Sequence, residues 1–249
     1  MMISLRSTVK NMLSVLFWQN LFLDFRIRLA SVSKQKPAYI RALIDRRRPN
    51  YTIWVPMSSI FLFLPNSDLA SVFGEKKVRK PNIPSLFWEG EWDLNVKNID
   101  PYYRDASQSY RSVHQMLKEG YHYTECDEYK AKLRTINNNK RTARGSSADE
   151  LNSYFENLLR IAESVKKDGY QSQSMMNGNP NDEVGVFIGR DGDIIKPEDK
   201  FSGTHRFAIA RCLGIDSICV QILAVHEDWA QKHLHLLAGP KKKLEQHFN

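Results

Sequence analysis

The sequence predicts an α+β fold, in which a small mixed β-sheet is flanked by helices and follows an N-terminal helical extension. Short β-branched segments at 51–55, 183–189 and 217–225 have the alternating or continuously apolar pattern of strands. Helical periodicity is clearest at 149–168. The chain has 249 residues, of which 42% are hydrophobic and 26% charged, so it can bury a sizeable core without disulfides.

The first 48 residues are predicted to form a basic amphipathic arm. Residues 1–50 contain ten Lys or Arg and two Asp or Glu, a balance of +8, whereas residues 51–249 contain 26 of each. Helices are predicted at 8–30 and 37–48, and the first can lie on an anionic membrane surface or pack against the domain. No apolar run reaches the roughly 18 residues that span a bilayer. We therefore expect a cytoplasmic protein that can bind a membrane peripherally through residues 8–30.

Residues 49–135 are expected to form the first part of the α/β domain. A short segment at 60–63, capped by a preceding serine, follows the first strand. An irregular, proline-containing connection is predicted at 65–85. Residues 101–135 have the pattern of helices in pieces, one of which ends at Gly120.

A polar segment separates this part from the predicted nucleotide-binding core at 149–230. Residues 136–148 predict a mobile loop. Ser147 then caps a helix, Glu150 completes a capping box, and Gly169 ends the helix.

The rest of this core is a strand, a hairpin, a helix and a final strand. The strand at 183–189 leads into an Asp-Gly turn and a return strand. A helix over 203–213 is expected to end at Gly214, before the strand at 217–225. Residues 231–249 are expected to be a C-terminal tail.

The start of the helix at 203–213 carries the clearest chemical signal. The first N–H groups of a helix lack backbone partners and attract anions. Gly203 permits a tight turn and close approach, Arg206 can bind phosphate oxygens in a forked geometry, and His205 can donate a hydrogen bond or carry a proton. The alternative is a structural His-Arg pair, with Arg206 bound to a carboxylate such as Asp193.

Residues 203–210, Gly-Thr-His-Arg-Phe-Ala-Ile-Ala, resemble the phosphate-binding element of the ParB/sulfiredoxin superfamily. Sulfiredoxins carry Gly-Gly-Cys-His-Arg there, and ParB-type proteins Gly-Glu-Arg-Arg. The similarity covers residues 150–230 specifically and 50–130 loosely. Further positions match a ParB-like branch of the superfamily: Ile188 to Gly192, Ile209, Ala210, Leu213, Gly214, Ile218, Val220, His226, Trp229 and Glu89 to Asp93.

The resemblance implies a nucleotide-binding protein that uses ATP or CTP with Mg²⁺, as a phosphotransferase or hydrolase of unknown acceptor. The residues implied to hold the triphosphate are Gly203, Thr204, His205 and Arg206. Because Thr204 occupies the position of the sulfiredoxin cysteine, sulfinic acid reduction is not expected.

Phosphoryl transfer requires carboxylates that bind Mg²⁺. The first candidates are the acidic residues of an aromatic and acidic cluster at 88–93. Glu89, Glu91 and Asp93 are the candidate catalytic or magnesium-binding groups. Their alternative is a surface turn packed by Trp88 and Trp92.

Three further residues, Arg190, Asp193 and His226, are secondary candidates for the site. Asp193 also suits the geometry of the hairpin turn, and His226 suits a structural role at the end of a strand.

Neither the histidines nor the cysteines predict a structural zinc site. The odd number of cysteines and the absence of a C-x-x-C pair favour free thiols and a reducing cytoplasm. Cys212 and Cys219 are expected to be small buried apolar residues.

Two other functions remain open. A ParB-like DNA-binding or nuclease-type protein would use the basic arm on phosphates, but the neutral charge of residues 51–249 disfavours DNA. A non-catalytic membrane-associated adaptor would dock through the same arm. The sequence leaves the oligomeric state unknown.

Overall fold

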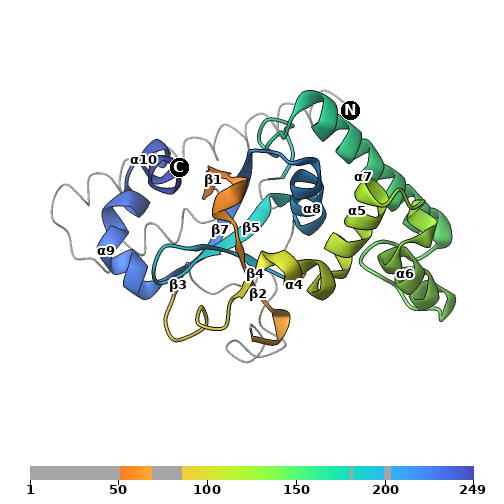
Figure 1. Cartoon of the computed structure of the whole chain (residues 1–249), viewed down its shortest axis with the longest axis horizontal. Helices are drawn as coiled ribbons and strands as arrows, with labels where there is room; N and C mark the ends of the chain where they lie inside the picture. Colours follow the sequence, from red (N-terminus) through yellow and green to blue (C-terminus); the bar gives the residue numbers. More distant parts are fainter. Residues whose placement is uncertain (1–50, 69–85, 180–181, 199–202) are drawn as a thin grey trace, which may run out of the picture.

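The computed structural model describes residues 51–68, 86–179, 182–198 and 203–249 (Figure 1). The predicted arm at 1–48 and most of the predicted connection at 65–85 lie outside them. The elements in chain order are β1 (Thr52–Pro56), η2 (Met57–Ser59), β2 (Leu62–Leu64), β3 (Phe87–Trp88), β4 (Lys97–Asn98), α4 (Ile99–Ala106), α5 (Gln108–Lys118), η4 (Tyr123–Glu125), α6 (Asp127–Asn137), α7 (Ala148–Asp168), β5 (Val184–Ile188), β6 (Ile194–Pro197), α8 (Thr204–Leu213), β7 (Ser217–His226), α9 (Glu227–Ala238) and α10 (Lys241–Phe248).

The strands of the described residues form one mixed sheet, which confirms the predicted α+β class. Its order is β1-β7-β5-β6-β2-β4, and β3 pairs with β7. The β5–β7, β2–β6 and β3–β7 pairs are parallel, whereas the β1–β7, β5–β6 and β2–β4 pairs are antiparallel. The adjacent central strands β5 and β7 are almost entirely buried, as expected for strands covered on both faces.

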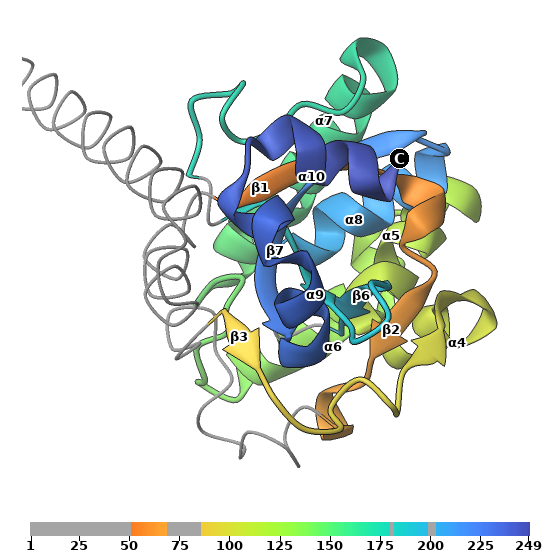
Figure 2. The same cartoon turned by 90° about the vertical axis from the view of Figure 1, so that its left-hand side faces the viewer.

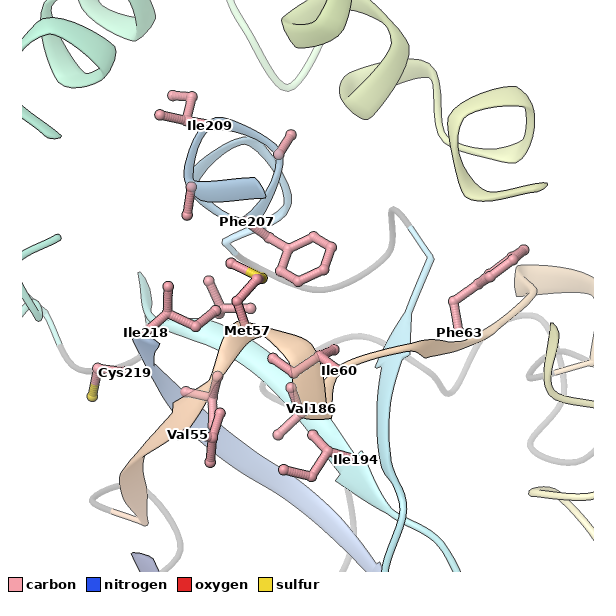
Figure 3. Close-up of a cluster of buried hydrophobic side chains, with 14 of the residues drawn as sticks. Val55, Met57, Ile60, Phe63, Val186, Ile194, Phe207, Ile209, Ile218 and Cys219 are labelled. Carbon is pink, nitrogen blue, oxygen red and sulfur yellow. The ribbon is translucent and has the colours of Figure 1, made fainter. Parts of the chain in front are cut away.

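Alternation along the strands creates an apolar core on each face of the sheet. Val186 of β5 belongs to the larger cluster, and Phe187 belongs to the smaller one. On the larger side, Phe207 of α8 points toward Met57 and the strands beneath it (Figure 3). This packing anchors α8, whose first turn lines the candidate site, against the centre of the sheet.

The C-terminal residues 231–249 fold into most of α9 and all of α10, which corrects the prediction of a tail. Figure 2 shows both helices lying across β1 and β7. The backbone N–H of Trp54 donates to Glu245 Oε1 at 2.9 Å, and the Tyr51 hydroxyl donates to the carbonyl of Leu237. The C-terminal helices therefore close one side of the domain.

The end residues predicted for the helix at 149–168 are found at the ends of α7. Ser147 Oγ accepts the N–H of Glu150 at 3.2 Å, and Gly169 follows the last helical residue. The Glu150 carboxylate accepts the N–H of Ser146, one residue before the expected partner, at 2.6 Å.

The capped segment expected at 60–63 is instead the approach to a strand. The Ser59 hydroxyl donates back to the carbonyl of Pro56 at 2.7 Å, and β2 follows. Within the described ranges, no helix combines the length and the apolar composition that crossing a bilayer requires.

Candidate functional site

A cavity of about 710 Å³ opens at the start of α8. Its walls come from the first turns of α5 and α8, from α6 and α7, and from the loop before α7. This volume lies within the range of about 300–1,000 Å³ that is usual for ligand sites. The lining residues are Gln108, Ser109, Glu128, Lys132, Ala143, Arg144, Tyr154, Asn157, Leu158, Ile161, Gln173, Asp182, Gly203, Thr204, His205 and Arg206.

Gly203 begins α8 in a conformation that glycine alone adopts readily. Its φ is +84°, and a Cβ here would lie 2.5 Å from the Cα and 2.7 Å from the N of Val184. The tight turn predicted at Gly203 is therefore confirmed. The group that Gly203 approaches closely is the backbone of β5. Gly203 provides no side-chain cap for α8, and no acidic residue lies in the first turn.

A second helix begins at the same cavity. Gln108 and Ser109, in the first turn of α5, belong to the lining. Ser107 Oγ caps α5 by accepting the N–H of Tyr110 at 3.0 Å. Because helix N-termini carry partial positive charge, two of them facing one cavity favour an anionic ligand. The sequence analysis missed this convergence, for which the Ser107 cap was the available signal.

His205 is held deep in the cavity wall by Glu128 and Tyr154. Its Nε2 lies 2.7 Å from Glu128 Oε2, and its Nδ1 lies 3.2 Å from the Tyr154 hydroxyl. Glu128 is 1% exposed, and its other oxygen accepts from Arg144 Nε at 3.2 Å. Burial alone raises the pKa of Glu128, but the hydrogen bond and charge of His205, followed by those of Arg144, lower this pKa to about 2. The carboxylate is therefore ionised at neutral pH and accepts a hydrogen bond from the N–H of Nε2.

Tyr154 completes the arrangement on the other side of the imidazole. Burial, with a smaller contribution from the charge of Glu128 and against the opposing charge of Arg144, raises the pKa of Tyr154 to about 12. The phenol is thus protonated at neutral pH, and its hydroxyl group lies within hydrogen-bond distance of Nδ1 of His205. The Arg144 guanidinium lies 5.0 Å above the Tyr154 ring.

Glu128, Arg144 and Tyr154 were not predicted as site residues. Tyr154 lies in the helix predicted at 149–168, and Arg144 lies in the segment predicted to be a mobile loop. Glu128 and His205 are 77 residues apart, so no local pattern connects them.

Arg206 lines the cavity and also forms a structural ion pair. Its Nη1 lies 3.3 Å from Glu183 Oε2, its Nη2 donates to the carbonyl of Gln171 at 2.5 Å, and its guanidinium lies 5.0 Å from the centre of the Tyr170 ring. Arg206 therefore has the carboxylate partner that the structural alternative required, but this partner is Glu183 and not Asp193.

The carboxylate cluster at 89–93 lies at the opposite end of β5. Arg190 follows this end, and its Nη2 binds Asp93 Oδ1 at 2.8 Å, while its backbone N–H binds Oδ2 at 2.7 Å. The strand β5 has five residues, Val184 to Ile188, so about 16 Å of strand lies between Arg190 and the end of β5 that Gly203 approaches. Glu89 and Glu91 are exposed. The structure does not bring these carboxylates to the start of α8.

Asp93, His226 and Asp193 form structural hydrogen bonds at this opposite end of β5. Burial alone raises the pKa of Asp93, but the hydrogen bonds from Arg190 lower it below the usual value. His226 Nδ1 caps α9 by accepting the N–H of Asp228, and its Nε2 donates to the carbonyl of Gly90 at 2.8 Å. The carbonyl of Asp193 accepts the N–H of Gly189 in the hairpin.

Among the described residues, no group of three or more His, Cys, Asp or Glu side chains is placed to hold a metal ion. Cys126, Cys212 and Cys219 are buried free thiols, which confirms the expectation for Cys212 and Cys219. No family model matches the chain, and comparisons with curated proteins and with solved structures gave no match.

Proposed function

We propose that the cavity at the start of α8 binds a nucleoside triphosphate, ATP or CTP, together with Mg²⁺, and that the protein is a phosphotransferase or hydrolase. The observation that carries this proposal is the convergence of the first turns of α5 and α8 on one cavity. Their N–H groups and partial charges favour phosphate oxygens. The resemblance of residues 203–210 to the phosphate-binding element of ParB/sulfiredoxin proteins supports the same assignment.

One cation of the lining is available to a polyanion. Of the basic residues Lys132, Arg144 and Arg206, Arg144 is paired with Glu128 and Arg206 with Glu183. Glu128 is already occupied by His205 and Arg144. Lys132 has no ion-pair partner within the described part of the chain, so its ammonium group is available to a phosphate.

The α7 side of the cavity suits the nucleoside. Seven residues separate Tyr154 from Ile161, so this wall extends for about 10 Å along the helix. Leu158 and Ile161 provide apolar contact, and Asn157 provides an amide that both donates and accepts hydrogen bonds. Asp182, exposed in the lining, is the carboxylate that we assign to the Mg²⁺ carried by the nucleotide.

The test is a titration of the purified full chain with ATP, CTP and GTP, each with Mg²⁺, beside two lysine variants. Lys132→Ala removes a cation from the cavity wall, whereas Lys130→Ala removes an exposed cation of the same helix that lies outside the lining. Loss of one charge-assisted phosphate contact is expected to weaken binding about tenfold in Lys132→Ala and to leave Lys130→Ala unchanged. Failure of the folded protein to bind any of the three nucleotides would refute the proposal.

The DNA-binding and adaptor alternatives depend on the basic arm. The arm lies outside the described residues, so no contact in the structure favours either alternative over nucleotide binding.

A further inference from the structure

Three side chains from three different helices form a continuous hydrogen-bonded row at the cavity. The Tyr154 hydroxyl of α7 lies 3.2 Å from His205 Nδ1 of α8, and His205 Nε2 lies 2.7 Å from Glu128 Oε2 of α6. All three residues belong to the cavity lining. We call this row the Tyr-His-Glu relay.

The order of protons in the relay follows from its chemistry. Glu128 is an ionised acceptor, so Nε2 of His205 holds the proton between them. In the neutral form of the imidazole, Nδ1 is then an acceptor, and the Tyr154 hydroxyl can donate to it. When a proton is added at Nδ1, the imidazolium faces the Glu128 carboxylate directly, and the carboxylate stabilises its charge. The row is therefore arranged to accept a proton from the cavity.

Both ring nitrogens of His205 are engaged within the relay, so its side chain does not direct an N–H group at the ligand. Its partners are also fixed. Arg144 holds the second oxygen of Glu128 and lies over the Tyr154 ring, and the backbone N–H of Glu128 donates to Ser112 Oγ at 2.9 Å. Such support restrains each group to one orientation, which a proton-transfer site requires.

We infer that His205 is the general base of this site, and that it receives the proton of the attacking water through the hydroxyl group of Tyr154. This inference rests on the proposed function. As the oxygen of the attacking group forms its bond to the terminal phosphorus, its proton passes to the Tyr154 oxygen, and the Tyr154 proton passes to Nδ1 of His205. The bond between that phosphorus and the bridging oxygen breaks, and the nucleoside diphosphate leaves with the bonding electrons. Glu128 acts through His205 and is a positioning residue.

The experiment separates nucleotide binding from turnover in the full chain. Binding of Mg²⁺-ATP and Mg²⁺-CTP is measured by titration, and turnover by release of inorganic phosphate into water at saturating nucleotide over a range of pH. The variants are Tyr154→Phe, which keeps the ring and removes the hydroxyl, His205→Gln and Glu128→Gln. Tyr123→Phe is the matched control, because the Tyr123 hydroxyl contacts Glu156 at 3.4 Å and lies outside the cavity lining.

For Tyr154→Phe and His205→Gln, we expect kcat to fall by about 10²–10⁴-fold while the nucleotide Kd stays within about twofold. The acidic limb of the wild-type pH profile should disappear in His205→Gln and shift in Glu128→Gln, an effect that a structural role alone would not produce. Tyr123→Phe should match the wild type.

The failures are distinguishable. If the folded protein binds none of the nucleotides, the proposed function is refuted, and the relay with it. If the nucleotide binds but no phosphate is released, or if Tyr154→Phe and His205→Gln release it at the wild-type rate, the relay is refuted and the binding function stands.

Discussion

The buried Glu128 carboxylate makes the stability of the protein depend on pH in a specific window. Its pKa is lowered from an ordinary value of 4.5 to about 2, despite burial, by His205 and Arg144. Because the pKa is lower in the folded state, the stabilisation is fully present above the unfolded value and is lost as the pH falls through the folded one. The difference between 4.5 and about 2 corresponds to about 3 kcal/mol of unfolding free energy.

The assay is urea unfolding of the wild type and Glu128→Gln between about pH 5.5 and pH 2.5, where an unfolded-state imidazole is already protonated. Between these two pH values, we expect the unfolding free energy of the wild type to fall by about 2–3 kcal/mol more than that of Glu128→Gln. Glu163→Gln, an exposed carboxylate on α7, should follow the wild type. A difference between wild type and Glu128→Gln that stays constant with pH would refute the reasoning, because the amide does not titrate.

Three further predictions concern the glycine turn, the thiols and the far end of β5. Gly203→Ala should lower the unfolding free energy by about 2–4 kcal/mol. Gly120→Ala is the control, because φ is also positive there but no atom lies within 4 Å, and it should lower the unfolding free energy by about 1 kcal/mol. Equal losses in urea unfolding would contradict the steric argument. Burial raises the pKa of Cys126 and Cys212 to about 11 and that of Cys219 to about 12. Relative to unfolded thiols, alkylation should therefore be about 100-fold slower at Cys126 and Cys212 and about 1,000-fold slower at Cys219, with mass spectrometry as the readout. Asp93→Asn should leave the nucleotide Kd within about twofold, since Asp93 and α8 lie at opposite ends of β5, which is about 16 Å long. A large loss of affinity in the same titration would show that Asp93 contributes to the site.

Elements with local signals could be predicted from the sequence. The Ser147 cap and Gly169 marked the ends of α7, and an Asp-Gly turn marked the hairpin between β5 and β6. Gly203 and Gly214 both adopt positive φ at the ends of α8, which is the conformation that glycine favours.

The elements and site residues that the sequence analysis missed depend on contacts between residues distant in the chain. The strands β2, β3 and β4 span two or three residues each, which is too short for a periodic pattern. The polar C-terminal sequence folds into helices because Trp229, Leu237 and Leu244 are buried against the domain. The carboxylates at 89–93 have suitable chemistry for magnesium, but the length of β5 places them away from α8.

The cavity is divided between two parts of the chain that differ in how they are supported. Its α8 side is attached to the central sheet through Gly203 and Phe207, so that a change there disturbs the folding core. The opposite walls, from Gln108 to Ile161, belong to helices inserted between β4 and β5. Exposed positions on those helices, such as Asn157, can therefore be exchanged with little effect on the sheet. This separation makes the inserted helices the practical place to redesign which ligand the protein selects.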